Sequence, residues 1–163
     1  MPFADHRATS AAAPPRQESR GMLVVEGSAD RRYSVVYVAD EGIYFGFLGF
    51  RLVDILRDAA QQSPFFLLRI KDLLIYWLSM VLERPDAERR YRNRLGDPDE
   101  FQSLHSLNMF LARPSVQSIR TAPQGALTFE LIGDQPQATW TPSTVKMCED
   151  LAAILAAAGY PVR

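Results

Sequence analysis

The sequence has little of what most enzymes and nucleic-acid-binding proteins use. Its 163 residues include one cysteine and two histidines, and the net charge is −1. A single cysteine, Cys148, excludes an internal disulfide and a cysteine-based metal site. A charge near zero gives no overall attraction to nucleic acid or another polyanion. We therefore expect no nucleic-acid partner, no metal and no other cofactor.

Catalytic motifs are missing as well. The sequence contains no phosphate-binding loop, dinucleotide glycine fingerprint, nucleophile elbow or zinc-binding histidine pair. His105 follows Phe101 and Leu104 on one face of an expected helix, which is typical of a helix-packing histidine. Cys148 has apolar neighbours and is expected to be an inert core thiol. We assign no catalytic residue and favour a non-enzymatic protein, with an enzyme of unknown reaction as the weakest alternative.

The N-terminus has arginines but no continuous apolar segment of the kind found in signal peptides, so we expect a cytoplasmic protein. Residues 1–21 have no apolar periodicity and are rich in alanine, proline and serine, which predicts a disordered tail. Residues 22–163 are enough for a single domain. Arginine supplies all but two of the 18 basic residues, a bias typical of GC-rich bacterial genomes.

The sequence predicts strands at the start of the domain, helices in its middle and strands again after them. β-Branched and aromatic runs separated by short polar turns predict an antiparallel meander at its start, over residues 22–27, 33–39 and 43–49. A period of 3.6 then predicts helices over residues 51–60, 64–84, 86–96 and 97–112. Alternating runs predict three more strands, over residues 115–121, 125–133 and 137–142.

Local signals refine these elements. Gly46 and Gly49 predict a bulge or a close backbone approach near the end of the third strand. Pro85 is expected to end or kink the helix over 64–84. An amphipathic helix over 142–160 closes the sequence, and its expected buried stripe is Val145, Cys148, Leu151, Ala152 and Leu155.

Two stretches carry a resemblance to a known superfold. "YSVVYVADEGIYFGFLG" is similar to the early hairpin, and "VQSIRTAPQGALTFELIGDQPQATWT" with the following helix is similar to the second sheet and capping helix, of bacterial pleckstrin-homology-like (PH-like) domains. The resemblance covers about residues 22–48 and 114–158. It implies an α+β fold with antiparallel sheets of three strands and then three strands, a helical insertion at about 50–112 and a C-terminal amphipathic helix.

The same resemblance has a consequence for lipid binding. Phosphoinositide-binding members of the superfold carry a basic motif over the first hairpin. This sequence has only Arg31 and Arg32 there, preceded by the acidic stretch "EGSAD". We therefore do not expect headgroup binding at that position.

The most apolar stretch is "PFFLLRIKDLLIYWLSMVLERP", residues 64–85, and its charges argue against a membrane span. Its longest uncharged run is ten residues, from Leu73 to Leu82. Eleven Leu, Ile, Phe and Val side chains favour insertion by about 3 to 7 kcal/mol in total. Three charges, on Arg69, Lys71 and Asp72, each oppose it by roughly 2.5 to 3.5 kcal/mol at the bilayer centre. The sum does not favour a transmembrane helix.

Three interpretations of this helix remain. A polar stripe that includes Arg69, Asp72 and Glu83 leaves about three quarters of the circumference apolar, more than one sheet can cover. The helix could be the packed centre of the insertion, which the pattern favours, or it could pack against a second copy or lie on a membrane surface. For a protein partner or a homodimer, the candidate interaction surface is Phe66, Leu74, Trp77 and Val81.

A basic run follows the apolar helix directly, a layout suited to anionic lipid. The candidate lipid contacts are Arg84, Arg89, Arg90, Arg92 and Arg94. Acidic residues dilute the run, and Asp86–Arg90 and Glu88–Arg92 have the spacing of ion pairs on a solvated helix, which is the favoured interpretation. A peripheral position at the inner membrane face is therefore kept as the alternative to a plain interaction module.

Overall fold

The computed structural model describes residues 18–28, 31–62, 65–133 and 137–163. These residues form seven strands and four α-helices, which confirms the predicted α+β class. Most of the predicted disordered tail lies outside the described residues. Its last four residues, 18–21, were placed there wrongly, because they pair with the neighbouring strands and open the first strand.

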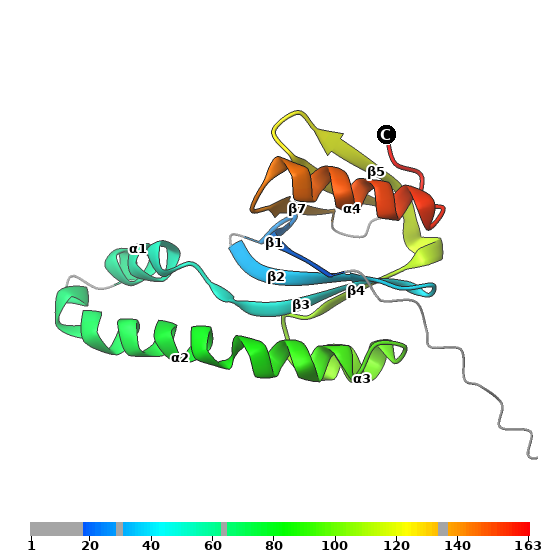
Figure 1. Ribbon diagram of the computed structural model, residues 1–163. Helices are drawn as coiled ribbons and strands as arrows, with labels where there is room; N and C mark the ends of the chain where they lie inside the picture. Colours follow the sequence, from blue (N-terminus) through cyan, green and yellow to red (C-terminus); the bar gives the residue numbers. More distant parts are fainter. Residues whose placement is uncertain (1–17, 29–30, 63–64, 134–136) are drawn as a thin grey trace, which may run out of the picture.

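The strands form one continuous antiparallel sheet, curled into a half-barrel, rather than two separate sheets (Figure 1). Its order is β4-β3-β2-β1-β7-β6-β5. Pairing of β1 with β7 joins the first strand group, β1 to β4, to the second strand group, β5 to β7. Gly21 lies at this joint, where a Cβ atom would be 2.5 Å from Cε2 of Trp140. The bounds are β1 (Glu18–Val25), β2 (Arg31–Val38), β3 (Gly42–Phe50), β4 (Met109–Ala112), β5 (Val116–Ala122), β6 (Ala126–Leu131) and β7 (Ala138–Pro142).

The first strand group has a fourth member, β4, where the sequence predicted the end of a helix over 97–112. The helix that begins there, α3 (Pro98–Ser103), is short. Asn108 explains the change, because its Nδ2 donates to the Phe101 carbonyl at 2.8 Å and its Oδ1 accepts from the Phe47 N–H at 2.9 Å. A side chain that bonds the backbone in this way competes with helical hydrogen bonding.

Helix α1 (Leu52–Gln62) agrees with its prediction, but α2 (Phe66–Arg92) does not end at Pro85. It runs on through the residues that were expected to form a separate charged helix. A proline inside a helix costs about 3 kcal/mol. Burial of the Tyr91 ring against the sheet offsets that cost, together with the ion pair that joins Glu88 of α2 to Arg20 of β1.

The last helix, α4 (Val145–Ala157), begins at Val145 rather than in the turn of Pro142, which ends β7. Thr144 caps it, because its hydroxyl accepts from the Met147 N–H at 3.3 Å. Of the predicted stripe, Cys148, Leu151 and Leu155 are buried and Ala152 is partly buried. Val145 was assigned to this stripe wrongly. It is exposed because it occupies the first turn, at the edge of the packed face.

Two hydrophobic cores lie on opposite faces of the first strand group. Helix α4 closes the concave side of the half-barrel over a core that includes Phe45, Phe129 and Trp140. Helices α2 and α3 cover the other side of β2 and β3, where Tyr44, Tyr91 and Phe101 pack together (Figure 1). The inserted helices therefore attach to the sheet through the second core, around the C-terminal half of α2.

Candidate functional site

Helix α1 and the N-terminal half of α2 form a hairpin that extends past the sheet (Figure 1). Helix α1 has no buried residue, and no described side chain of α2 before Glu88 is buried. The favoured expectation of a deeply packed helix over 64–84 is therefore wrong. The helix stays exposed because the sheet ends below the middle of α2, and among the described elements α1 is the one that packs beside the part of α2 that extends further.

The outer face of this half of α2 carries a row of exposed apolar side chains. We call Leu68, Ile75, Leu78 and Leu82 the apolar seam, which Lys71 interrupts. With Lys71 counted, the positions are spaced by three and four residues, so they fall within an arc of about 80° on the helix. With Leu67 and Leu74 at its flank, the exposed fractions of these leucines and the isoleucine range from 41% to 81%.

The predicted interaction residues lie partly off this seam. Leu74 is exposed and flanks it. Trp77 and Val81 are half-buried, on the side of α2 that turns toward the rest of the protein. The side chain of Phe66 lies outside what the structure describes. The seam itself was missed, although its three- and four-residue spacing is readable in the sequence, because the helix was expected to be covered.

The arginine run is largely engaged within the chain. The Nε of Arg84 donates to the Leu48 carbonyl at 3.0 Å, and its guanidinium lies 5.0 Å from the ring centre of Tyr33. The other contacts are ion pairs, Arg89 with Asp86 at 2.9 Å, Arg92 with Glu88 at 4.0 Å and Arg94 with Glu100 at 2.5 Å. Of the five, only Arg90 has no hydrogen bond or ion pair among the described residues.

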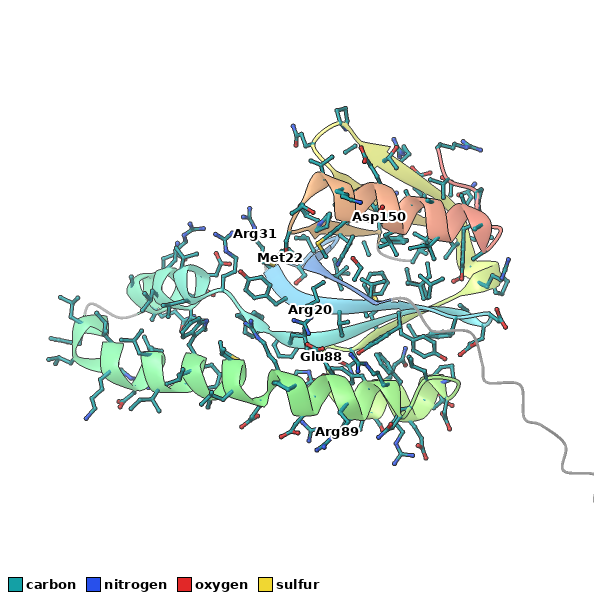
Figure 2. The ribbon with its side chains drawn as sticks, in the orientation of Figure 1. Arg20, Met22, Arg31, Glu88, Arg89 and Asp150 are labelled. Atoms are coloured by element: carbon teal, nitrogen blue, oxygen red, sulfur yellow. The ribbon has the colours of Figure 1, made fainter. Side chains whose placement is uncertain are left out.

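The ion pair between Glu88 and Arg92 that their spacing predicted is confirmed, but Glu88 is not solvated as expected. It is buried on the sheet side of α2 and lies 2.7 Å from Arg20 of β1, whereas Arg89 points away from the sheet (Figure 2). Likewise, Asp86 pairs with Arg89 and not with Arg90. Glu88 is buried because the charged segment continues α2 along the sheet and turns residue 88 inward.

A groove of about 160 Å³ lies beside this segment, between the end of β3, the middle of α2 and the turn after α3. Phe47, Leu48 and Gly49 line it from β3. Helix α2 contributes Tyr76, Met80, Glu83, Arg84, Ala87, Arg90 and Tyr91, and the turn contributes Leu104 and His105. The groove therefore combines an apolar lining with two guanidinium groups and one carboxylate.

Two glycines of β3 shape the groove. A bulge in the β2–β3 pairing includes Gly49, whose φ of +124° is a conformation that other residues rarely adopt. At Gly46 a Cβ atom would lie 2.6 Å from Cδ2 of Tyr91. Tyr91 in turn donates its hydroxyl hydrogen to the Phe47 carbonyl at 2.8 Å. The predicted bulge and close approach are both confirmed, and they bring α2 close to the end of β3.

His105 lies in the turn after α3, not within a helix as expected. Its ring stacks on Phe47 at 4.4 Å between centres, and its Nδ1 accepts from the Leu107 N–H at 3.1 Å. Burial, together with the positive charge of Arg32, lowers the pKa of His105 below its usual value. The neutral ring therefore carries its proton on Nε2.

Other chemistry is sparse in the part of the chain that the structure describes. No three His, Cys, Asp or Glu side chains there gather in a way that could hold a metal ion. Cys148 is buried in α4, and burial raises the pKa of its thiol, with Glu149 adding to the effect. Among the same residues no helix is long and apolar enough to cross a membrane, in agreement with the energy estimate for residues 64–85.

Comparison with protein-family models, with curated proteins and with solved structures finds no match to this chain.

Proposed function

We propose that this protein is a non-enzymatic interaction module, a PH-like domain whose helical insertion carries a surface for self-association. The PH-like assignment is supported by the two strand groups of the half-barrel and by the C-terminal helix α4 that closes it. The insertion then lies between β3 and β4, over residues 51–108. A cytoplasmic location is part of the proposal.

The observation that carries the proposal is the exposed apolar seam on α2. The seam and its two flanking leucines present on the order of 600 Å² of apolar surface, against about 800 Å² per partner in a standard protein interface. An uncovered apolar patch of this size is the usual mark of a contact surface. Its three- and four-residue spacing is the pattern with which one helix packs along another.

Charge favours a second copy of the chain as the occupant, paired in the antiparallel direction. Lys71 lies toward the N-terminal end of the seam, whereas Asp86 lies just beyond its C-terminal end on the same side of the helix. A two-fold axis at Leu78 places Lys71 opposite residue 85 of the second copy, next to Asp86. The same axis brings Leu82 opposite Leu74 and Leu78 opposite its own copy. Parallel pairing would instead set Lys71 against Lys71.

The membrane alternative receives less support. Its basic run would have to attract anionic lipid, but four of the five arginines are engaged within the chain. Exchange of an internal ion pair for a lipid contact gains little. The apolar seam is therefore assigned to a protein surface, and lipid binding becomes an outcome that the experiment can detect.

Light scattering coupled to size-exclusion chromatography tests the proposal. We expect the full chain to have the mass of a dimer, and Ile75→Glu to have the mass of a monomer with unchanged circular dichroism. Arg69→Glu, on the polar side of the same helix, is the matched control and should remain dimeric. A wild-type chain that stays a monomer at high concentration would overturn the proposal. Cosedimentation of that monomer with anionic vesicles would favour the membrane alternative instead.

A further inference from the structure

We infer that the groove between β3, α2 and His105 binds a carboxylate carried on an apolar or aromatic group. The inference is independent of the self-association proposal. The groove opens on a different side of α2, because Tyr76, Glu83 and Arg90 lie about 100° around the helix from the centre of the apolar seam.

Arg84 supplies a guanidinium that is already held in place. Its Nε is used in the bond to the Leu48 carbonyl, and the Tyr33 ring supports its flat face. Its two Nη groups make no hydrogen bond within the described part of the chain and are available to a ligand. A guanidinium fixed in this way loses little side-chain entropy when it binds, and its paired N–H groups match the two oxygens of a carboxylate.

Arg90 supplies a second guanidinium one and a half turns further along α2. It lines the groove and is exposed, and it alone of the five arginines in the run has no ion pair or hydrogen bond among the described residues. Arg89, its neighbour, does not line the groove and is paired with Asp86. The free charge of the run is therefore the one that faces the groove.

His105 and Phe47 supply the surface for the rest of the ligand. The stacked rings line the groove, and Met80 and Leu104 add to the lining. The Nδ1 of His105 accepts from the Leu107 N–H, so the neutral imidazole carries its hydrogen on Nε2 and can donate it to a ligand. A ligand with an aromatic or branched apolar group beside its acid can contact the apolar lining with that group and the two guanidinium groups with its acid.

The groove's own charges distinguish a carboxylate from a phosphate. Arg84 and Arg90 give two positive charges, and Glu83 on the same lining gives one negative charge. A monoanion neutralises a net charge of about one, whereas a phosphate dianion would leave an excess negative charge beside the Glu83 carboxylate. The small volume suits a single residue or a small organic acid. The acid can therefore belong to a free small molecule or to the C-terminus of a peptide.

Calorimetric titration of the full chain with matched acid and amide ligands tests the inference. The free-acid probe is N-acetylphenylalanine and its neutral control is N-acetylphenylalaninamide. We expect the acid to bind at least about tenfold more tightly than the amide, which is the loss of about 1.4 kcal/mol expected when a charged contact is removed. A tetrapeptide that ends in phenylalanine, in free and amidated forms, separates the two sources. Tighter binding of its free form than of N-acetylphenylalanine indicates a chain terminus.

Variants distinguish the groove from general attraction to arginine. Arg90→Gln should weaken binding of the acid by about tenfold, while Arg89→Gln, which removes an equally exposed charge outside the groove, should leave it unchanged. Both positions are exposed, so folding is not at risk. Equal binding of acid and amide, an equal loss in both variants, tighter binding of inorganic phosphate, or no binding of either acid at about 10 mM would each overturn the inference.

Discussion

Glu88 of α2 and Arg20 of β1 form an ion pair at 2.7 Å in which the acid side chain is 6% exposed and the arginine 64% (Figure 2). The pair crosses from the helix to the sheet directly after Pro85. It marks the point at which α2 is fixed to the sheet, and the half of the helix before it is left without cover from the sheet. The position of this anchor therefore decides how much apolar surface the hairpin exposes.

Removal of the anchor should destabilise the protein. Arg20→Ala leaves the Glu88 carboxylate buried with only Arg92 nearby, at 4.0 Å. We expect a loss of about 1 to 2 kcal/mol in the free energy of unfolding, below the full cost of a broken buried pair because Arg20 is largely exposed. Urea denaturation measures it. Arg89→Ala removes an exposed pair and should cost less than about 0.5 kcal/mol. Equal losses in the two variants would contradict the assignment.

The close approach of Gly46 and Tyr91 gives a second prediction. Gly46→Ala forces a methyl group to within 2.6 Å of the Tyr91 ring, which overpacks the second core and should cost about 1 to 3 kcal/mol. The loss should be much smaller in a Tyr91→Leu background, where the ring is absent. Thermal and urea denaturation of the two single variants and the double variant measure this coupling. Additive losses would show that the helix does not press on β3 at this point.

The lowered pKa of His105 predicts a dependence of stability on pH. The unfolded chain binds the proton of His105 more tightly than the folded protein does, so the free energy of unfolding rises with pH through the window just below the usual value of 6.5. This contribution of His105 to the free energy of unfolding is complete above pH 6.5, and it is lost as pH falls to the pKa of the folded protein. His105→Gln should remove this part of the slope in urea denaturation between about pH 5 and pH 8. If the free energy of unfolding of His105→Gln depends on pH as it does in the wild type, His105 is not the source of the pH dependence.

The direction of helix pairing in the proposed dimer can be tested by charge exchange. Lys71→Glu should weaken the dimer, because in the antiparallel arrangement it sets an acid beside Asp86 of the second copy. Lys71→Glu combined with Asp86→Lys should restore much of the affinity, since each exposed pair contributes about 0.2 to 1 kcal/mol. Sedimentation equilibrium measures the dissociation constants. Parallel pairing predicts no such recovery.

Much of this architecture can be predicted from the sequence, and the failures share a cause. Alternation and turn residues locate the strands β2, β3, β5, β6 and β7 because each follows from local pattern. Strand β4 was missed because its four residues are placed by hydrogen bonds of Asn108 to distant backbone groups. The run of α2 through Pro85 was missed for a related reason, since burial of Tyr91 on the sheet and the distant ion pair of Glu88 with Arg20 outweigh a local helix-ending signal.

The candidate sites were harder to predict than the elements. The sequence indicates that α2 has more apolar surface than one core can cover, but which face stays exposed depends on where the sheet ends. The groove depends on the bulge at Gly49 and on a turn that brings His105 beside β3, and neither placement is encoded near Arg84 or Arg90. Local patterns could therefore suggest an interaction surface without identifying its residues.

Cysteine crosslinking at the centre of the seam tests the self-association claim most directly. In antiparallel pairing about Leu78, residue 78 meets its own copy, and the native Cys148 is buried and does not compete. Leu78→Cys under mild oxidation should give a disulfide-linked dimer, while Arg69→Cys, on the polar side of α2, should remain uncrosslinked. If Leu78→Cys stays monomeric, or crosslinks no better than Arg69→Cys, the seam is not the surface through which two copies of this chain associate.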